Sequence, residues 1–167
     1  MDRSDAPRDG LSSRDALIAA AIGVLALALR LCFLFHSPDR AWPHSLLYEG
    51  DAPVWARWAA ALESGQRFEF DLPFRTPGVA WILYALGASA APFTAAKLLW
   101  CVISAATPAV LYLVLASRFT RRAGLIAATL CTLSHGSFVL ATSLNNETPY
   151  ALLVVLQAGA TLTWMLP

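Results

Sequence analysis

The chain of 167 residues is 57% hydrophobic and only 14% charged, and its mean hydropathy is +0.56. These values are more apolar than those of an average soluble domain and indicate an integral membrane protein. A formal net charge of +1 argues against a nucleic-acid partner. The three cysteines lie apart without a Cys-x-x-Cys spacing, which argues against a zinc site or a disulfide framework.

The first apolar run, Ala16 to His36, has about the 20 residues that are needed to cross a bilayer and follows a short polar tail, residues 1–15. It ends in large residues rather than the small ones of a signal-peptide cleavage site, which indicates an uncleaved anchor with a cytoplasmic tail. Arg30 lies near its end. We expect this side chain to reach the head groups as an interface anchor, with a phosphate contact as the alternative.

A polar loop, Tyr48 to Pro77, then gathers carboxylates, arginines and tryptophans within an otherwise apolar chain. Asp51 followed by Pro53 predicts a helix start, and Gly65 predicts its end. The apolar side chains of this segment recur at helical spacing: Val54, Trp55, Trp58 and Leu62. The pattern predicts an amphipathic helix that lies on the membrane with its tryptophans at head-group level.

The next segment, Thr76 to Pro92, is apolar but is broken by glycines and bounded by prolines. Only about 14 of its residues suit a span, fewer than the hydrocarbon thickness requires. We therefore expect a re-entrant or interfacial helix here, inside an outer loop of residues 37–92.

Three later runs are long and almost free of charge: Phe93 to Ser117, Ala123 to Thr142 and Pro149 to Leu166. Short basic connectors such as Arg118 to Arg122 are typically retained in the cytoplasm. With a cytoplasmic N-terminus, this connector lies on the cytoplasmic side only if the segment Thr76 to Pro92 does not cross the membrane. We therefore predict an all-α integral membrane protein with about four transmembrane helices, plus amphipathic juxtamembrane helices in the outer loop. Five spans are the alternative.

The four-span topology places Glu49 and Asp51 on the same outer face as Glu147, between the third and fourth spans. Asp51 is read either as a helix cap or as a general base, and Glu49 either as a solvated loop carboxylate or as part of the same site. Glu147 fits a first-turn acid that the helix dipole stabilises, with Thr148 as the cap and Pro149 at the first helical position.

Three motifs in this order resemble a known family: Tyr-Glu-Gly-Asp-Ala at 48–52, Phe-Arg-Thr-Pro-Gly at 74–78 and Asn-Asn-Glu at 145–147. They are similar to the N-terminal module of GT-C membrane glycosyltransferases, which include the protein O-mannosyltransferases, the aminoarabinose transferases and bacterial enzymes of the Rgt-like type. The resemblance covers residues 16–167.

The resemblance implies inverting transfer of a sugar from a polyprenyl-phosphate carrier to an acceptor glycan, lipid or protein. The active face would be the periplasmic or extracellular side of a bacterial inner membrane. Asp51 matches the position of the base that takes the acceptor proton. Arg75 matches the region of a basic residue for the carrier phosphate, whose oxygens an arginine can engage through two donors.

Other residues are weaker candidates in the same site. Arg57 and Lys97 are either further phosphate contacts or surface charges, and Asn146 belongs to the second motif. Glu147 is expected to assist Asp51 or to help hold a divalent cation, although two carboxylates far apart in sequence define no metal site. We therefore assign no certain cofactor.

The motifs also depart from the family pattern. Gly50 separates Glu49 from Asp51 where many relatives have an adjacent acidic pair, so either carboxylate can be the base; Thr76 stands where many have a proline. Relatives usually have more spans, so the chain resembles a C-terminally truncated piece that is inactive alone. A membrane scaffold or inactive fragment is the alternative. A small transporter is disfavoured, because transporters place ionisable residues well inside their spans, where this chain offers only Arg30 and no buried carboxylate.

Overall fold

The computed structural model describes residues 11–36, 52–66, 77–88 and 93–165. Within these ranges the chain forms helices and no strand, so the predicted all-α class is confirmed. The helices are α1 (Ser13–His36), α2 (Ala52–Glu63), α3 (Gly78–Ala85), α4 (Thr94–Arg118), α5 (Arg121–Leu133), α6 (His135–Thr142) and α7 (Glu147–Met165).

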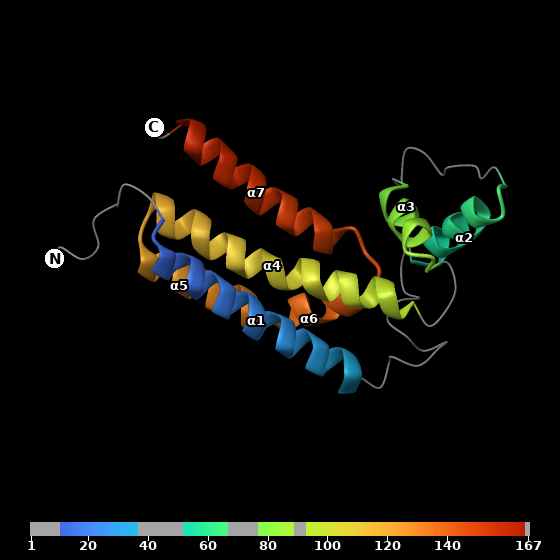
Figure 1. The fold of residues 1–167 in the computed structure, drawn as a ribbon, viewed down its shortest axis with the longest axis horizontal. Helices are drawn as coiled ribbons and strands as arrows, with labels where there is room; N and C mark the ends of the chain where they lie inside the picture. Colours follow the sequence, from blue (N-terminus) through green and yellow to red (C-terminus); the bar gives the residue numbers. More distant parts are fainter. Residues whose placement is uncertain (1–10, 37–51, 67–76, 89–92, 166–167) are drawn as a thin grey trace.

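Four antiparallel passes run along the molecule, formed by α1, α4, the pair α5 and α6, and α7 (Figure 1). Helix α4 lies at the centre and contacts each of the other three passes. The start of α1 and the connection from α4 to α5 lie at one end of the bundle, which we call the N-terminal end. Helices α2 and α3 and the turn from α6 to α7 lie at the opposite end, the loop end.

Two of the described helices, α1 with 24 residues and α4 with 25, are long and apolar enough to cross a membrane. At about 1.5 Å per residue each exceeds the hydrocarbon thickness of about 30 Å. The pair α5 and α6 adds a third span if it is counted as one despite a bend of 56°. Helix α7 has 19 residues and is not among these candidates, so four spans stay a prediction. Helix α3 has 8 residues, too few to cross.

The predicted span Ala123 to Thr142 is interrupted rather than continuous. Helix α5 ends at Leu133, Ser134 takes an extended backbone with φ −62° and ψ 122°, and α6 starts at His135. The sequence Ser-His-Gly-Ser at 134–137 explains the break, because serine and glycine are poor residues for a helix interior and serine competes for backbone hydrogen bonds.

The apolar stripe of α2 packs against protein. Trp55 and Trp58 are 2% and 7% exposed and belong to a core that α2 shares with α3, the start of α4 and the turn before α7. The neighbouring helices therefore cover the stripe, whereas the place of these tryptophans at head-group level stays a prediction. The exposed aromatic pair of this end lies on α3, where Trp81 and Tyr84 meet edge to face.

Candidate functional site

Three of the predicted site residues, Glu49, Asp51 and Arg75, lie outside the described residues, and their roles stay predictions. The other four are described. Arg57 lies on α2, Lys97 in the first turn of α4, and Asn146 and Glu147 at the start of α7. All three elements meet at the loop end of the bundle (Figure 1).

The core at the loop end joins segments that are far apart in the sequence. It contains buried residues of α2 and α3, Ala96 and Trp100 of α4, and Leu144 of the turn between α6 and α7. The structure thus brings the first-loop helices and the Asn145 to Glu147 turn to one end of the molecule. These segments lie at one end because their buried side chains pack in one core. This arrangement does not depend on which side of a membrane that end faces.

The turn itself is fixed by the side chain of Asn145. Its Nδ2 donates to the carbonyl oxygens of Leu140 at 2.6 Å and Ser143 at 2.8 Å. Its Oδ1 accepts from the backbone N–H of Thr148 at 2.8 Å, and the Thr148 hydroxyl donates to the Leu140 carbonyl at 2.9 Å. Asn145, and not Thr148 as predicted, therefore caps α7, because Thr148 is already inside the helix with its hydroxyl turned back to α6.

Trp100 ties this turn to the bundle. Its indole Nε1 donates to the backbone oxygen of Asn145 at 3.0 Å, and the side chain is fully buried. Asn146 and Glu147 are exposed on the turn that these bonds hold. Glu147 lies in the first turn of α7, where the helix dipole favours a carboxylate, so the simpler interpretation of this residue agrees with its position.

The two basic candidates differ in burial. Arg57 is exposed on α2, as a surface charge would be. Lys97 is only 6% exposed, so the interpretation of this residue as a surface charge is wrong. The cause is its place in the first turn of α4, beside Phe93 and Ala96 of the loop-end core. Since Arg57 is exposed and Lys97 is buried, Lys97 is the described cation best placed to lie inside a site at this end.

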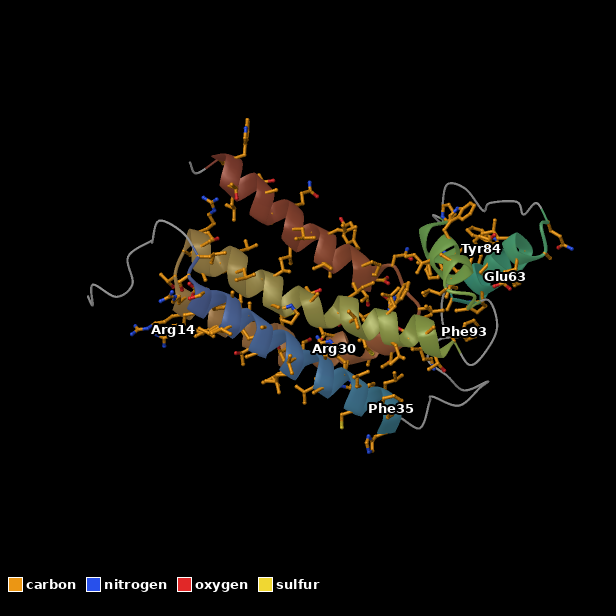
Figure 2. The ribbon with its side chains drawn as sticks, viewed as in Figure 1. Arg14, Arg30, Phe35, Glu63, Tyr84 and Phe93 are labelled. Carbon is orange, nitrogen blue, oxygen red and sulfur yellow. The ribbon has the colours of Figure 1, made fainter. Side chains whose placement is uncertain are left out.

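Arg30 does not extend to the head groups as predicted but points into the bundle and is fully buried. Its guanidinium donates from Nε to Ser104 Oγ at 2.7 Å, from Nη1 to the Ala26 carbonyl at 3.0 Å and from Nη2 to Ser137 Oγ at 3.1 Å. Its charge also lies 5.6 Å from the ring centroid of Phe138. Figure 2 shows Arg30 in the middle part of the bundle. These acceptors on α4 and α6 explain why the side chain turns inward.

Asp15 forms a second polar cluster that the sequence interpretation missed. Arg121 of α5 donates to both carboxylate oxygens at 2.6 Å, and the Tyr112 hydroxyl of α4 donates to Oδ1 at 3.0 Å. The Ser12 hydroxyl donates to Oδ2 at 2.6 Å, while the backbone N–H of Asp15 donates to Ser12 Oγ at 3.3 Å. This Ser-x-x-Asp capping pattern was readable from the sequence. It starts α1 at Ser13, inside the predicted tail.

The Asp15 cluster is a structural lock. It joins α1, α4 and α5 at the N-terminal end, opposite the candidate site, and both carboxylate oxygens already accept bonds from the chain. It also corrects the expectation that the helical bundle holds no buried carboxylate, since Asp15 is only 2% exposed.

A metal site is not formed by the part of the chain that the structure describes, in which no three His, Cys, Asp or Glu residues lie close enough to hold an ion. Glu49 and Asp51 are outside that part, so the role of Glu147 beside a divalent cation stays a prediction.

Comparison of the chain with protein-family models, curated proteins and solved structures finds no match. The likeness to GT-C transferases therefore rests on the three short motifs.

Proposed function

We propose that the chain is a membrane-embedded part of a GT-C type glycosyltransferase, which transfers a sugar from a polyprenyl-phosphate carrier to an acceptor glycan, lipid or protein. The observation that carries the proposal is the gathering of the first-loop helices, the buried Lys97 and the Asn145 to Glu147 turn at one end of a bundle with helices of bilayer length. All three family-like motifs adjoin these elements in the sequence.

The proposal includes four spans, α1, α4, the α5 and α6 pair, and α7, with the loop end on the outer face. Two features support it. The 19 residues of α7 reach about 28 Å, close to the hydrocarbon thickness. Basic residues also gather at the N-terminal end, which would be cytoplasmic: Arg14, Arg118, Arg121 and Arg122.

In the proposed chemistry a carboxylate of the first loop takes the proton from the acceptor hydroxyl. We assign this role to Asp51, with Glu49 as the alternative. The acceptor oxygen then bonds to the anomeric carbon while the bond from that carbon to the phosphate oxygen breaks, and the carrier phosphate leaves with the negative charge. Arg75 and Lys97 would stabilise that charge. Asn146 and Glu147, exposed on a fixed turn, would contact the sugar or the acceptor.

The chemical test measures transfer of radiolabelled sugar from polyprenyl-phosphate donors in membranes that contain the protein as its gene encodes it. Asp51→Asn should lower the rate at least about a hundredfold, the usual contribution of a general base. Asp71→Asn, which changes another carboxylate of the same loop, is the matched control. If Asp51→Asn and Glu49→Gln both keep the full rate at normal expression, the assignment of the base is wrong. If no donor supports transfer by the wild type, a scaffold role is favoured instead.

The topology is tested by single cysteines and a reagent that does not cross membranes. Cysteines placed at Ser64 and Glu147, both exposed at the loop end, should react from outside the cell, and one at the exposed Phe119 should react only after the membrane is opened. Reaction of Ser64→Cys and Glu147→Cys from opposite sides would refute the four-span arrangement.

A further inference from the structure

The break between α5 and α6 leaves backbone groups that an intact helix would pair. In a continuous helix the carbonyl of Cys131 would accept from the N–H of His135. Here it accepts instead from the hydroxyl of Ser137 at 3.1 Å, and the same hydroxyl lies 2.7 Å from the carbonyl of Ser134. A serine hydroxyl has one proton, so the two carbonyls share it. This repair matters because unpaired backbone groups are costly at membrane depth.

Arg30 holds the repairing hydroxyl in place. Its Nη2 donates to Ser137 Oγ at 3.1 Å, so the serine accepts from the guanidinium and its own proton is left for the carbonyls. Its Nε donates to Ser104 Oγ at 2.7 Å, and Ser104 Oγ in turn donates to the backbone oxygen of Ser137 at 3.4 Å. One side chain of α1 therefore binds α4 and the first turn of α6 at the point where the third pass bends.

The type of residue fits this task. A guanidinium presents donors in a fixed fork and can reach acceptors on several helices, whereas a lysine carries its charge at a single point. Among the described residues Arg30 has no carboxylate partner, and its charge is shared among neutral acceptors and the ring of Phe138. A second ring, that of Phe33, stacks on Phe138 at 5.9 Å. Burial of this charge costs more folding free energy than burial of an apolar side chain would. A geometry that depends on the guanidinium would explain why the position holds an arginine.

Helix α6 carries the turn at the loop end. The backbone N–H of Ser143 donates to the Val139 carbonyl at 3.1 Å. The carbonyl of Leu140 accepts from both Asn145 Nδ2 and the Thr148 hydroxyl. Any rotation of α6 about the break would therefore move Asn146 and Glu147 with it.

We propose that Arg30 is a positioning residue, which fixes the bend between α5 and α6 and thereby places the Asn145 to Glu147 turn at the loop end. This role concerns the geometry of the bundle and stands whether or not the chain transfers a sugar.

The test measures distances between pairs of spin labels by pulsed electron paramagnetic resonance in lipid nanodiscs, after Cys32, Cys101 and Cys131 are replaced by alanine. The reporting pair is Val24 and Leu140, which joins α1 to α6 beyond the break. The control pair is Leu17 and Ile126, which joins α1 to α5 before it. All four labelled side chains are exposed.

Arg30→Met keeps most of the side-chain volume and removes the donors. It should widen the Val24 to Leu140 distance distribution roughly twofold or split it, and leave the control pair unchanged, since a freed break becomes a hinge. Arg30→Lys should fail to restore the narrow distribution. A reporting distribution as narrow in Arg30→Met as in the wild type, even with a lower melting temperature, overturns the proposal.

If Arg30→Met disturbs both pairs or does not fold, Ser137→Ala decides. It removes the hydroxyl through which the guanidinium reaches the break, and it should widen the reporting pair alone. Ser117→Ala is the matched control, because that hydroxyl donates to Val114 within α4 and joins no two helices. An unchanged reporting pair in Ser137→Ala, or equal widening in both serine variants, refutes the role of Arg30.

Discussion

Replacement of Trp100 by phenylalanine tests whether the loop-end turn is held as the structure indicates. The change keeps an aromatic ring in the core but removes the Nε1–H that donates to the backbone oxygen of Asn145 at 3.0 Å. Trp100 itself is 0% exposed, whereas its acceptor Asn145 is half-buried.

Two contributions set the magnitude. Loss of the hydrogen bond to this part-buried carbonyl costs about 1 kcal/mol. The indole exceeds the phenyl ring by about 40 Å³, and at about 24 cal/mol per Å³ the cavity adds about 1 kcal/mol. Together Trp100→Phe should lower the free energy of unfolding by about 2 kcal/mol, which for a chain of this size lowers Tm by about 4–8 °C.

The assay is thermal unfolding in one detergent, with hydrogen exchange as a local readout. The Thr148 amide, which Asn145 caps, should exchange faster in Trp100→Phe. Trp81→Phe is the matched control, because Trp81 is 50% exposed on α3 and should change stability by less than about 0.5 kcal/mol. Equal melting temperatures for the two variants, or unchanged exchange at Thr148, would refute the anchoring role of Trp100.

Three further predictions concern other parts of the bundle. In thermal unfolding Gly124→Ala should destabilise the protein by about 1–3 kcal/mol, because the new Cβ would lie 2.9 Å from a backbone oxygen of α4. Gly23→Ala has its nearest contact at 3.6 Å and should be neutral or stabilising by up to about 1 kcal/mol. In single-cysteine variants a maleimide should modify the exposed Cys32 in the folded protein and the buried Cys101 only on unfolding, as mass spectrometry can follow. Asp15→Asn should speed amide exchange in the first turn of α1 and leave the loop-end turn unchanged. Equal stability changes for the two glycine variants, equal modification of the two cysteines, or faster amide exchange at both ends of the bundle would contradict these contacts.

The helices themselves were predictable because long apolar runs determine them. The starts and ends of α1 and α4 lie within a few residues of the apolar boundaries, and the short α3 follows from its flanking glycines and prolines. The break at Ser134 was not predicted, although the cluster of small and polar residues at 134–137 marks it. A hydropathy average conceals such a cluster, since the apolar residues on both sides outweigh it.

The direction of buried side chains could not be predicted locally. Arg30 near the end of an apolar run can extend to the head groups or turn inward, and its partners Ser104 and Ser137 lie 74 and 107 residues away in the sequence. The same limit applies to the prediction of what covers the apolar stripe of α2. Its period shows that Trp55 and Trp58 share a buried face, but an amphipathic pattern does not say whether lipid or protein covers that face.

The partners of the buried polar groups also explain where a functional site can lie among the described residues. Both oxygens of the Asp15 carboxylate accept bonds from the chain, and Arg30 directs donors to three acceptors of its own bundle. Binding a substrate at either group would require these bonds to break. Asn146 and Glu147 are instead exposed on a turn whose backbone is fixed by its neighbours, which is the arrangement that a preorganised site requires. Substitution of the bundle groups should therefore alter stability or geometry first, whereas substitution of these two should first alter the sugar transfer that we propose.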